Sequence, residues 1–138
     1  MAGDPTLTVD VLTPEGEVFS GEVVQLSTRT VDGELGVLAN HVPVLAGLTP
    51  NLLRLRISDN EVEEYAQSHG VLQVFANHAQ VLLEEAVPAG ELDLAALEAE
   101  LSGVEERIGD PKAGDAARAV AERDLERIKA FIAIAKGE

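Results

Sequence analysis

The hydrophobic pattern of this chain changes its period at Pro88–Gly90, and the change limits the folds that it can adopt. Before these residues, apolar side chains form runs of a few residues separated by Gly, Pro, Asp and Asn. After them, Ala, Leu, Glu and Arg predominate, and apolar residues return every three or four positions. Alternation with a period of two is typical of strands, and a period near 3.6 is typical of helices. The pattern therefore predicts two domains, a β-domain over residues 1–87 and a helical one over residues 88–138.

The first part predicts a set of short strands. Over residues 53–58, Leu and Ile alternate with Arg and Ser, which indicates a strand with one face in the core and one face in water. Turn signals such as Asp32-Gly33 separate the runs. The other predicted strands cover residues 7–12, 18–20, 22–29, 62–66, 71–75 and 80–84. Many short strands at this spacing favour a barrel-like β-sandwich of about ten strands.

The second part predicts an antiparallel hairpin of two helices. The apolar positions of the first helix are Leu94, Leu97, Leu101, Val104 and Ile108, and those of the second are Ala121, Leu125, Ile128, Ile132 and Ala135. Both sets have heptad-like spacing. We expect Asp93 and Asp115 to be the N-caps, and residues 109–114, with Gly and Pro, to break the helix. So short a hairpin is only marginally stable alone, and we expect it to be mobile and to need a surface on which to dock.

The charge and composition exclude several classes of function. The net charge is −15, and residues 1–87 contain 13 acidic residues against three basic ones, Arg29, Arg54 and Arg56. Such a surface repels phosphate backbones, so we expect no nucleic-acid partner. There is no cysteine, and the three histidines lack ligand spacing, so no metal site is predicted. No apolar run reaches the roughly 18 residues that span a bilayer, so membrane association is expected only through partners.

Three segments resemble those of one known family. Residues 32–45 read Asp-Gly-Glu-Leu-Gly-Val-Leu-Ala-Asn-His-Val-Pro-Val-Leu and resemble the Gly-Glu-Leu-Gly loop of ATP synthase epsilon subunits. Residues 68–74 resemble the family's Gly-Gly-Phe-Leu-Glu-Val strand, with His69 where the first Gly is usual. Residues 82–93 resemble the passage from its last strand to its first helix. The resemblance extends over nearly the whole chain and identifies it as similar to the epsilon subunit of a bacterial-type F-type ATP synthase.

The resemblance implies partners for the first part. In this family the sandwich binds the gamma subunit and the ring of membrane c subunits. Glu34 and Leu35 would face the ring, where Glu34 could pair with a basic residue, and His41 would lie near gamma. Gly33, Gly36 and Pro43 have an alternative role, which is only to form turns of the sandwich. The alternative for His41 is that it is an ordinary hydrogen-bonded loop histidine.

The resemblance also raises the question of nucleotide binding. Some bacterial epsilon subunits bind ATP through an Ile/Leu-Asp-x-x-Arg-Ala motif and arginines of the second helix. Here Leu92, Asp93, Arg123 and Arg127 match, but Ala96 stands in place of the motif arginine. We therefore expect ATP binding to be weak or absent and predict no cofactor. The alternative role for the two arginines is pairing in water with residues of their own helix, namely Glu122, Asp124 or Glu126.

The function that the resemblance implies is that of a non-catalytic rotor subunit of the central stalk, at the cytoplasmic face of the cell membrane. It would couple proton-driven rotation of the ring to ATP synthesis. Its hairpin, when extended, would contact the alpha/beta catalytic head through Arg118, Arg123 and Arg127 and inhibit ATP hydrolysis. No motif orders serines and acids into a catalytic array. Two alternatives remain open at this point: an adaptor that dimerises through its helices, and a small hydrolase on a sandwich fold.

Overall fold

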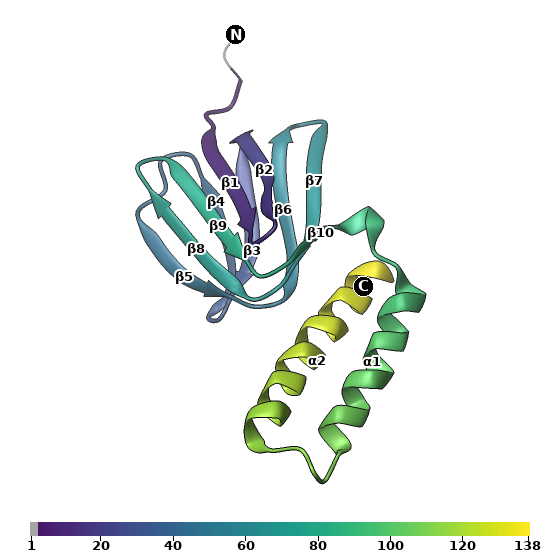
Figure 1. The fold of residues 1–138 in the computed structure, drawn as a ribbon. Coiled ribbons are helices and arrows are strands. Elements are labelled where there is room, and N and C mark those ends of the chain that lie inside the picture. Colours follow the sequence, from purple (N-terminus) through teal and green to yellow (C-terminus); the bar gives the residue numbers. More distant parts are fainter. Residues whose placement is uncertain (1–2) are drawn as a thin grey trace.

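The computed structural model describes residues 3–138 as a β-sandwich followed by a helical hairpin (Figure 1). The predicted fold class is confirmed. The strands are β1 (Leu7–Thr13), β2 (Gly16–Val23), β3 (Gln25–Thr30), β4 (Gly33–Leu38), β5 (Val44–Leu48), β6 (Asn51–Ser58), β7 (Glu61–Gln67), β8 (Gly70–Phe75), β9 (His78–Leu83) and β10 (Ala86–Pro88). A 3-10 turn η1 (Ala89–Glu91) leads into the helices α1 (Leu94–Gly109) and α2 (Asp115–Ala135).

The strands form one continuous sheet that folds over into two layers. Its order is β10-β7-β6-β3-β5-β8-β9-β1-β2, and β4 pairs with β3. Strands β3 and β5 share a single residue pair, Thr30 with Leu48, and the sheet turns from one layer to the other there. The first layer contains β10, β7, β6, β3 and β4, and the second contains β5, β8, β9, β1 and β2. Only β1 and β9 run parallel; the other pairs are antiparallel.

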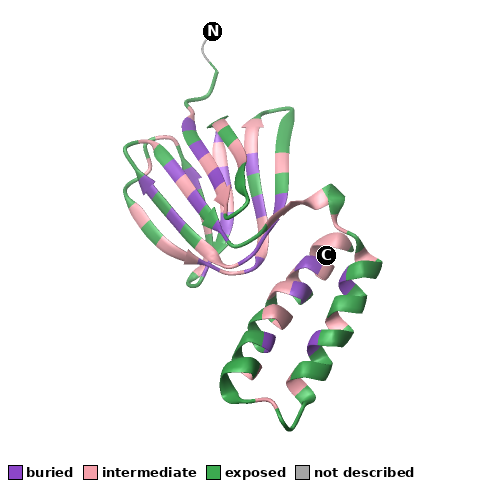
Figure 2. Ribbon diagram, viewed as in Figure 1, coloured by how far each residue is buried: buried purple, intermediate pink, exposed green. Residues whose placement is uncertain are grey.

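Aliphatic side chains from both layers fill the core of the sandwich. In β1 the buried residues alternate as Leu7, Val9 and Val11, and they pack with buried residues of the first layer such as Leu53 and Leu55. Figure 2 shows this alternation of buried and exposed positions along the strands. Such a pattern is what a strand with one face toward a core requires. The prediction of a half-buried strand over residues 53–58 is confirmed as β6.

A buried glutamine satisfies the backbone where the layers meet. Gln67 has no exposed surface. Its Nε2 donates to the carbonyl oxygens of Arg29 (3.1 Å) and Thr49 (2.8 Å), and its Oε1 accepts a hydrogen bond from the hydroxyl of Thr28. A buried amide without hydrogen-bond partners would destabilise the fold, but both the Nε2 and the Oε1 of Gln67 have partners.

Two strand predictions need correction. The predicted strand 22–29 is two strands, because β2 ends at Val23 and β3 begins at Gln25. The segment 32–45, expected as a loop, contains β4, which forms a tight hairpin with β3. The tight-turn signal predicted at Asp32-Gly33 lies in this hairpin, where Val31 and Asp32 form the turn. Gly33 begins β4 with a φ of +123° that residues with a Cβ rarely adopt.

The helices pack on one another along the predicted seams. Val104, Ala121 and Ile128 are buried between α1 and α2. Asp93 is the N-cap of α1, as predicted, and its Oδ1 accepts a hydrogen bond from the N–H of Ala96 at 3.1 Å. Within residues 3–138, neither helix is long and apolar enough to cross a membrane.

The second cap prediction is wrong by one residue. The N-cap of α2 is Gly114, whose φ of −76° and ψ of 169° are extended, and no side chain caps the helix there. Asp115 is the first helical residue instead. Its carboxylate still lies at the positive end of the helix dipole, where an anion is favourable.

Candidate functional site

The surface between the hairpin and the sandwich is the candidate functional site, because it holds the two parts together. Its apolar portion is small. Ala66 of β7, Leu97 of α1 and Phe131 of α2 are buried there, with Val87 of β10 packed against them. Phe131 is only 1% exposed. Burial of one such side chain contributes about 1.5–3 kcal/mol, so this cluster is a modest anchor for the hairpin.

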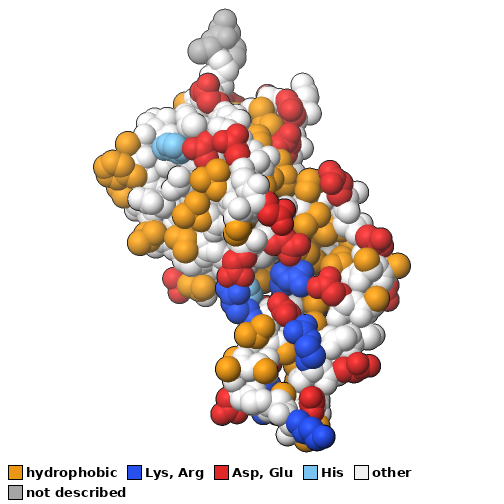
Figure 3. Space-filling model, viewed as in Figure 1, with side chains coloured by type: hydrophobic (Ala, Val, Ile, Leu, Met, Phe, Trp, Pro, Cys, Tyr) orange, Lys and Arg blue, Asp and Glu red, His pale blue; other side chains and the backbone are white. Residues whose placement is uncertain are grey.

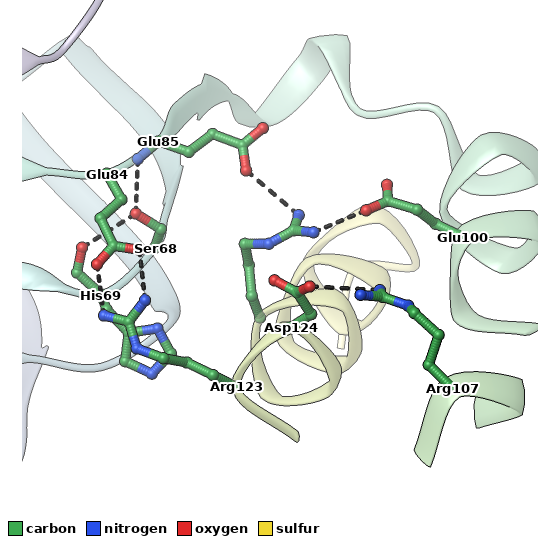
Figure 4. A network of polar contacts seen from close by, with 9 residues as sticks. Ser68, His69, Glu84, Glu85, Glu100, Arg107, Arg123 and Asp124 are labelled. Atoms are coloured by element: carbon green, nitrogen blue, oxygen red, sulfur yellow. Dashed lines mark hydrogen bonds and ion pairs between the residues drawn. The ribbon is translucent and has the colours of Figure 1, made fainter. Parts of the chain in front are cut away.

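The polar portion begins with a bidentate ion pair between α2 and the end of β9. The guanidinium of Arg123 donates from Nη1 to Glu84 Oε1 at 2.6 Å and from Nη2 to Glu84 Oε2 (Figure 4). The hydrogen bond from Arg123 holds the pKa of the Glu84 carboxyl below its usual value, and the same contact raises the pKa of Arg123. Both side chains are about half exposed, so water screens the pair.

Arg127 of α2 contacts the segment after β9, helix α1 and a phenylalanine of its own helix. Its Nη1 donates to Glu85 Oε1 at 3.2 Å, and its Nη2 donates to Glu100 Oε2 of α1 at 2.7 Å. The guanidinium carbon also lies 5.5 Å from the centre of the Phe131 ring, a favourable cation–π distance. Only 16% of the Arg127 side chain is exposed, so this arginine is better shielded from water than Arg123.

The segment before the hairpin is itself fixed by a serine. The N–H of Glu85 donates to Ser68 Oγ at 2.7 Å, and Ser68 Oγ donates to the carbonyl oxygen of His69. His69 Nε2 lies 3.1 Å from Glu126 Oε1 of α2, a third contact between the sandwich and the hairpin. Figure 3 shows the basic side chains gathered among acidic ones where the two parts meet.

The structure places the predicted site residues in separate regions. Glu34 is exposed on β4, whereas Leu35 is half-buried and packs against the core of the sandwich. His41 follows β4, and its Nδ1 lies 2.7 Å from the carbonyl oxygen of Val42. Arg118 lies in the first turn of α2, at the opposite end of the hairpin from Asp93. Only Arg123 and Arg127 lie together, on the face of α2 that meets the sandwich.

The partners expected for these two arginines within their own helix are wrong. They pair with Glu84, Glu85 and Glu100 instead, while Asp124 pairs with Arg107 across the hairpin. The sequence offers one signal that could have led to them, the two adjacent acids Glu84 and Glu85 shortly before the change of hydrophobic period at Pro88–Gly90.

A second polar cluster lies on the outer face of the second layer. Asp10 accepts a hydrogen bond from Ser20 Oγ at 2.7 Å and lies 2.6 Å from His78 Nε2. The hydrogen bond from Ser20, and then the one from His78, holds the pKa of Asp10 below its usual value. The serine hydroxyl donates to the carboxylate rather than to a histidine. The cluster is therefore ordered serine–aspartate–histidine and does not have the serine–histidine hydrogen bond of a Ser-His-Asp array.

Comparisons with known proteins give a consistent result. The family model described as "ATP synthase, Delta/Epsilon chain, beta-sandwich domain" matches residues 6–89. The chain is 45% identical over 86 residues to the ATP synthase epsilon chain of Persephonella marina, covering 62% of this chain and 63% of that one. It is 37% identical over 110 residues to the ATP synthase epsilon chain of Priestia megaterium, covering 80% and 81%. The match to the Persephonella chain thus spans less than two thirds of that relative's length.

Solved structures share the fold. A chain of the Euglena gracilis mitochondrial ATP synthase, in a structure of OSCP, F1 and c-ring, superposes with a TM-score of 0.80 at 24% identity. That match covers 96% of this chain and 83% of the other. A chain of the Tetrahymena thermophila mitochondrial ATP synthase, from its central stalk and c-ring, superposes with a TM-score of 0.67 at 15% identity and covers 97% and 99%. Sandwich and hairpin together therefore occur in other chains.

Proposed function

The chain belongs to the delta/epsilon family of ATP synthase chains, and from this membership we propose that it is a non-catalytic subunit of the central stalk of a bacterial-type F-type ATP synthase. The resemblance to epsilon subunits, which residues 32–45, 68–74 and 82–93 carry, is confirmed by the family match and by the epsilon-chain relatives. Support for the stalk position comes from the two similar folds, which belong to complexes described by their F1, central stalk and c-ring.

The proposed role of the sandwich is to join the gamma subunit to the ring of c subunits, so that ion-driven rotation reaches the catalytic head. Exposed Glu34 on β4 and the loop at His41 suit contacts with those partners. Large apolar side chains also remain exposed on the outer face of the second layer, notably Leu45 (76%) and Phe75 (65%). Exposed apolar groups of this size favour a protein partner. Association with the cytoplasmic face of the membrane is proposed to be peripheral, through these partners.

The proposed role of the hairpin is conformational inhibition of ATP hydrolysis. The observation that carries this proposal is the way in which α2 docks on the sandwich. Two of its arginines form ion pairs with exposed glutamates, Arg123 with Glu84 and Arg127 with Glu85. Exposed ion pairs and one small apolar cluster hold the hairpin weakly, so docked and extended states can differ by about a few kcal/mol. Undocking frees the guanidinium of Arg123 and releases Arg127 from Glu85, while the contact of Arg127 with Glu100 lies within the hairpin. With Arg118, these arginines would bind acidic surfaces of the catalytic subunits.

Reconstitution tests this function. The full chain is added to an ATP synthase complex stripped of its own epsilon subunit. Retention of the chain with gamma and the c-ring, ATP-driven ion pumping and ATP hydrolysis are then measured. Stoichiometric retention and restored pumping are expected. Failure to bind gamma and the ring would remove the stalk role, and binding without an effect on hydrolysis would leave coupling as the only role.

The adaptor alternative loses its main support. It rested on heptad seams available for dimerisation, but the seam residues Val104, Ala121 and Ile128 are buried between α1 and α2 of one chain. The expected state of the isolated chain in sedimentation is therefore a monomer.

A further inference from the structure

The outer face of the first layer is covered by the hairpin at one end only. Ala66 of β7 is fully buried beneath Phe131, whereas the strip of β4, β3 and β6 beyond it is open. All three basic residues of residues 1–87 lie on this open strip: Arg29 on β3, and Arg54 and Arg56 on β6. The buried residues of β3 are Leu26, Thr28 and Thr30, so Gln25, Ser27 and Arg29 point outward.

The strand register hollows this strip. Ser27 of β3 lies opposite Gly36 of β4 on one side and opposite Arg54 of β6 on the other. Ser27 and Gly36 have small side chains, so the surface of the sheet is recessed at this pair between the longer side chains of Gln25 and Arg29. The result is a groove of about 440 Å³ whose lining includes Gln25, Ser27, Arg29, Glu34, Gly36 and Arg54.

The groove retains hydrogen-bond donors that no residue from 3 to 138 uses. Arg54 donates to Glu64 through Nε alone, and both its terminal nitrogens are left over. Arg29 forms no ion pair with any of residues 3–138, although Glu34 lies opposite it in the register. Two guanidinium groups that are only partly neutralised therefore line one groove, on a domain that otherwise carries a large excess of acid.

We propose that this groove binds an extended acidic segment of another polypeptide, with carboxylates two residues apart. Guanidinium groups bind carboxylates through paired hydrogen bonds. Arg54 lies opposite Ser27, and Arg29 follows Ser27 by two positions, roughly 7 Å along strand β3. Residues two apart in an extended segment lie roughly 7 Å apart, so one carboxylate can reach each arginine. The site goes beyond the proposed function and shares Glu34 of its lining with the proposed contact to gamma and the ring.

A peptide titration of the full chain tests the site. The probe is a capped five-residue peptide with glutamates at its second and fourth positions, at about 0.15 M salt, where long-range repulsion is screened. We expect NMR shift changes at the Arg29 and Arg54 side chains and at the Ser27 and Gly36 amides. The double variant Arg29→Gln/Arg54→Gln should raise the Kd at least about tenfold, as expected for the loss of charged donors. The corresponding glutamine peptide should not bind.

Matched controls distinguish binding in this groove from a general attraction of the peptide to positive charge. Lys112→Gln/Lys129→Gln removes the same charge from exposed hairpin residues and should leave the Kd unchanged. The single variant Arg29→Gln breaks no ion pair, so it remains informative if the double variant folds poorly. Shift changes spread over the surface, or equal weakening by the lysine variant, would overturn the proposal. So would inorganic tripolyphosphate if it binds the same arginines as tightly as the peptide, since phosphate would then be the ligand.

Discussion

Arg123 of α2 and Glu84 of the sandwich, 39 positions apart in the sequence, form a two-point hydrogen-bonded ion pair. The pair lies beside the contacts of Arg127 with Glu85 and of His69 with Glu126, so three charged or polar contacts hold α2 against the end of β9 and its flanking loops. Removal of these contacts should release the hairpin without affecting either part alone. This expectation leads to the following predictions.

The double variant Glu84→Gln/Glu85→Gln should raise the undocked fraction of the hairpin several-fold. Each exposed pair contributes about 0.2–1 kcal/mol, so two lost pairs shift the equilibrium by roughly 2- to 30-fold. Hydrogen exchange of α2 amides measures the change. The matched control is Glu91→Gln/Glu98→Gln, which removes two exposed carboxylates without ion pairs among the described residues and should exchange like the unmodified chain.

Docking should weaken in acid. Arg123 lowers the pKa of Glu84 in the docked state, so the docked state binds fewer protons than the released state. The stabilisation is therefore complete above the ordinary carboxyl pKa, which is 4.5, and is lost as the pH falls through the lowered value. The protection of the hairpin amides, taken relative to their intrinsic exchange rates, should be constant from pH 7 to about pH 5 with respect to this group and should fall between pH 5 and pH 3.5. In Glu84→Gln the acid-induced fall should be smaller; an identical fall would contradict the assignment.

Phe131→Ala should undock the hairpin more strongly than any loss of charge. Truncation of a fully buried phenylalanine costs about 3–5 kcal/mol, and Phe131 is the largest buried side chain at this surface. Chemical denaturation followed by probes in the hairpin and in the sandwich should show two transitions instead of one. Val120→Ala, at a position that is 59% exposed on the same helix, is the control and should change stability by less than about 0.5 kcal/mol.

A chain without residues 89–138 should fold as a sandwich and still join the complex. Its core consists of residues from β1 to β9 and includes none from the helices. With the proposed inhibitor removed, ATP hydrolysis by the reconstituted complex should rise. Unchanged hydrolysis, with the truncated chain retained in the complex, would exclude the inhibitory role.

ATP should bind the isolated chain only near millimolar concentration or not at all. A phosphate would have to displace Glu84 and Glu85 from the arginines, and the carboxylate of Asp93 is already engaged as a helix cap. Isothermal titration measures the affinity, and a micromolar Kd would refute this expectation. The double variant Glu84→Gln/Glu85→Gln separates the causes, since tighter binding there would show that internal carboxylates compete with phosphate.

Local signals predicted most of the fold. The change of hydrophobic period marks where strands give way to helices, and the cap at Asp93 follows from one residue type before an apolar run. The cap of α2 was missed because Gly114 and Asp115 are adjacent and both can precede a helix. Only the backbone angles at Gly114 distinguish them.

The candidate site was harder to predict because its pairs are distant in sequence. The type and spacing of Arg123 and Arg127 marked them as important, but their partners depend on how the hairpin lies on β7 and β10. Helical spacing alone favoured neighbours on the same helix, and that choice was wrong. The grouping of Arg29 with Arg54 likewise follows from the β3–β6 register, which no local pattern determines.

The parallel pairing of β1 with β9 has a consequence for synthesis on the ribosome. The first strand finds its neighbour, Thr8 beside His78, only after most of the sandwich has been translated. Contacts between such distant residues form slowly, because a long loop must close before they can be made. The edge of β1 opposite β2 therefore stays unpaired in the nascent chain until β9 leaves the exit tunnel. The hairpin is translated after the strands, so it reaches a sandwich whose last strands have only just emerged.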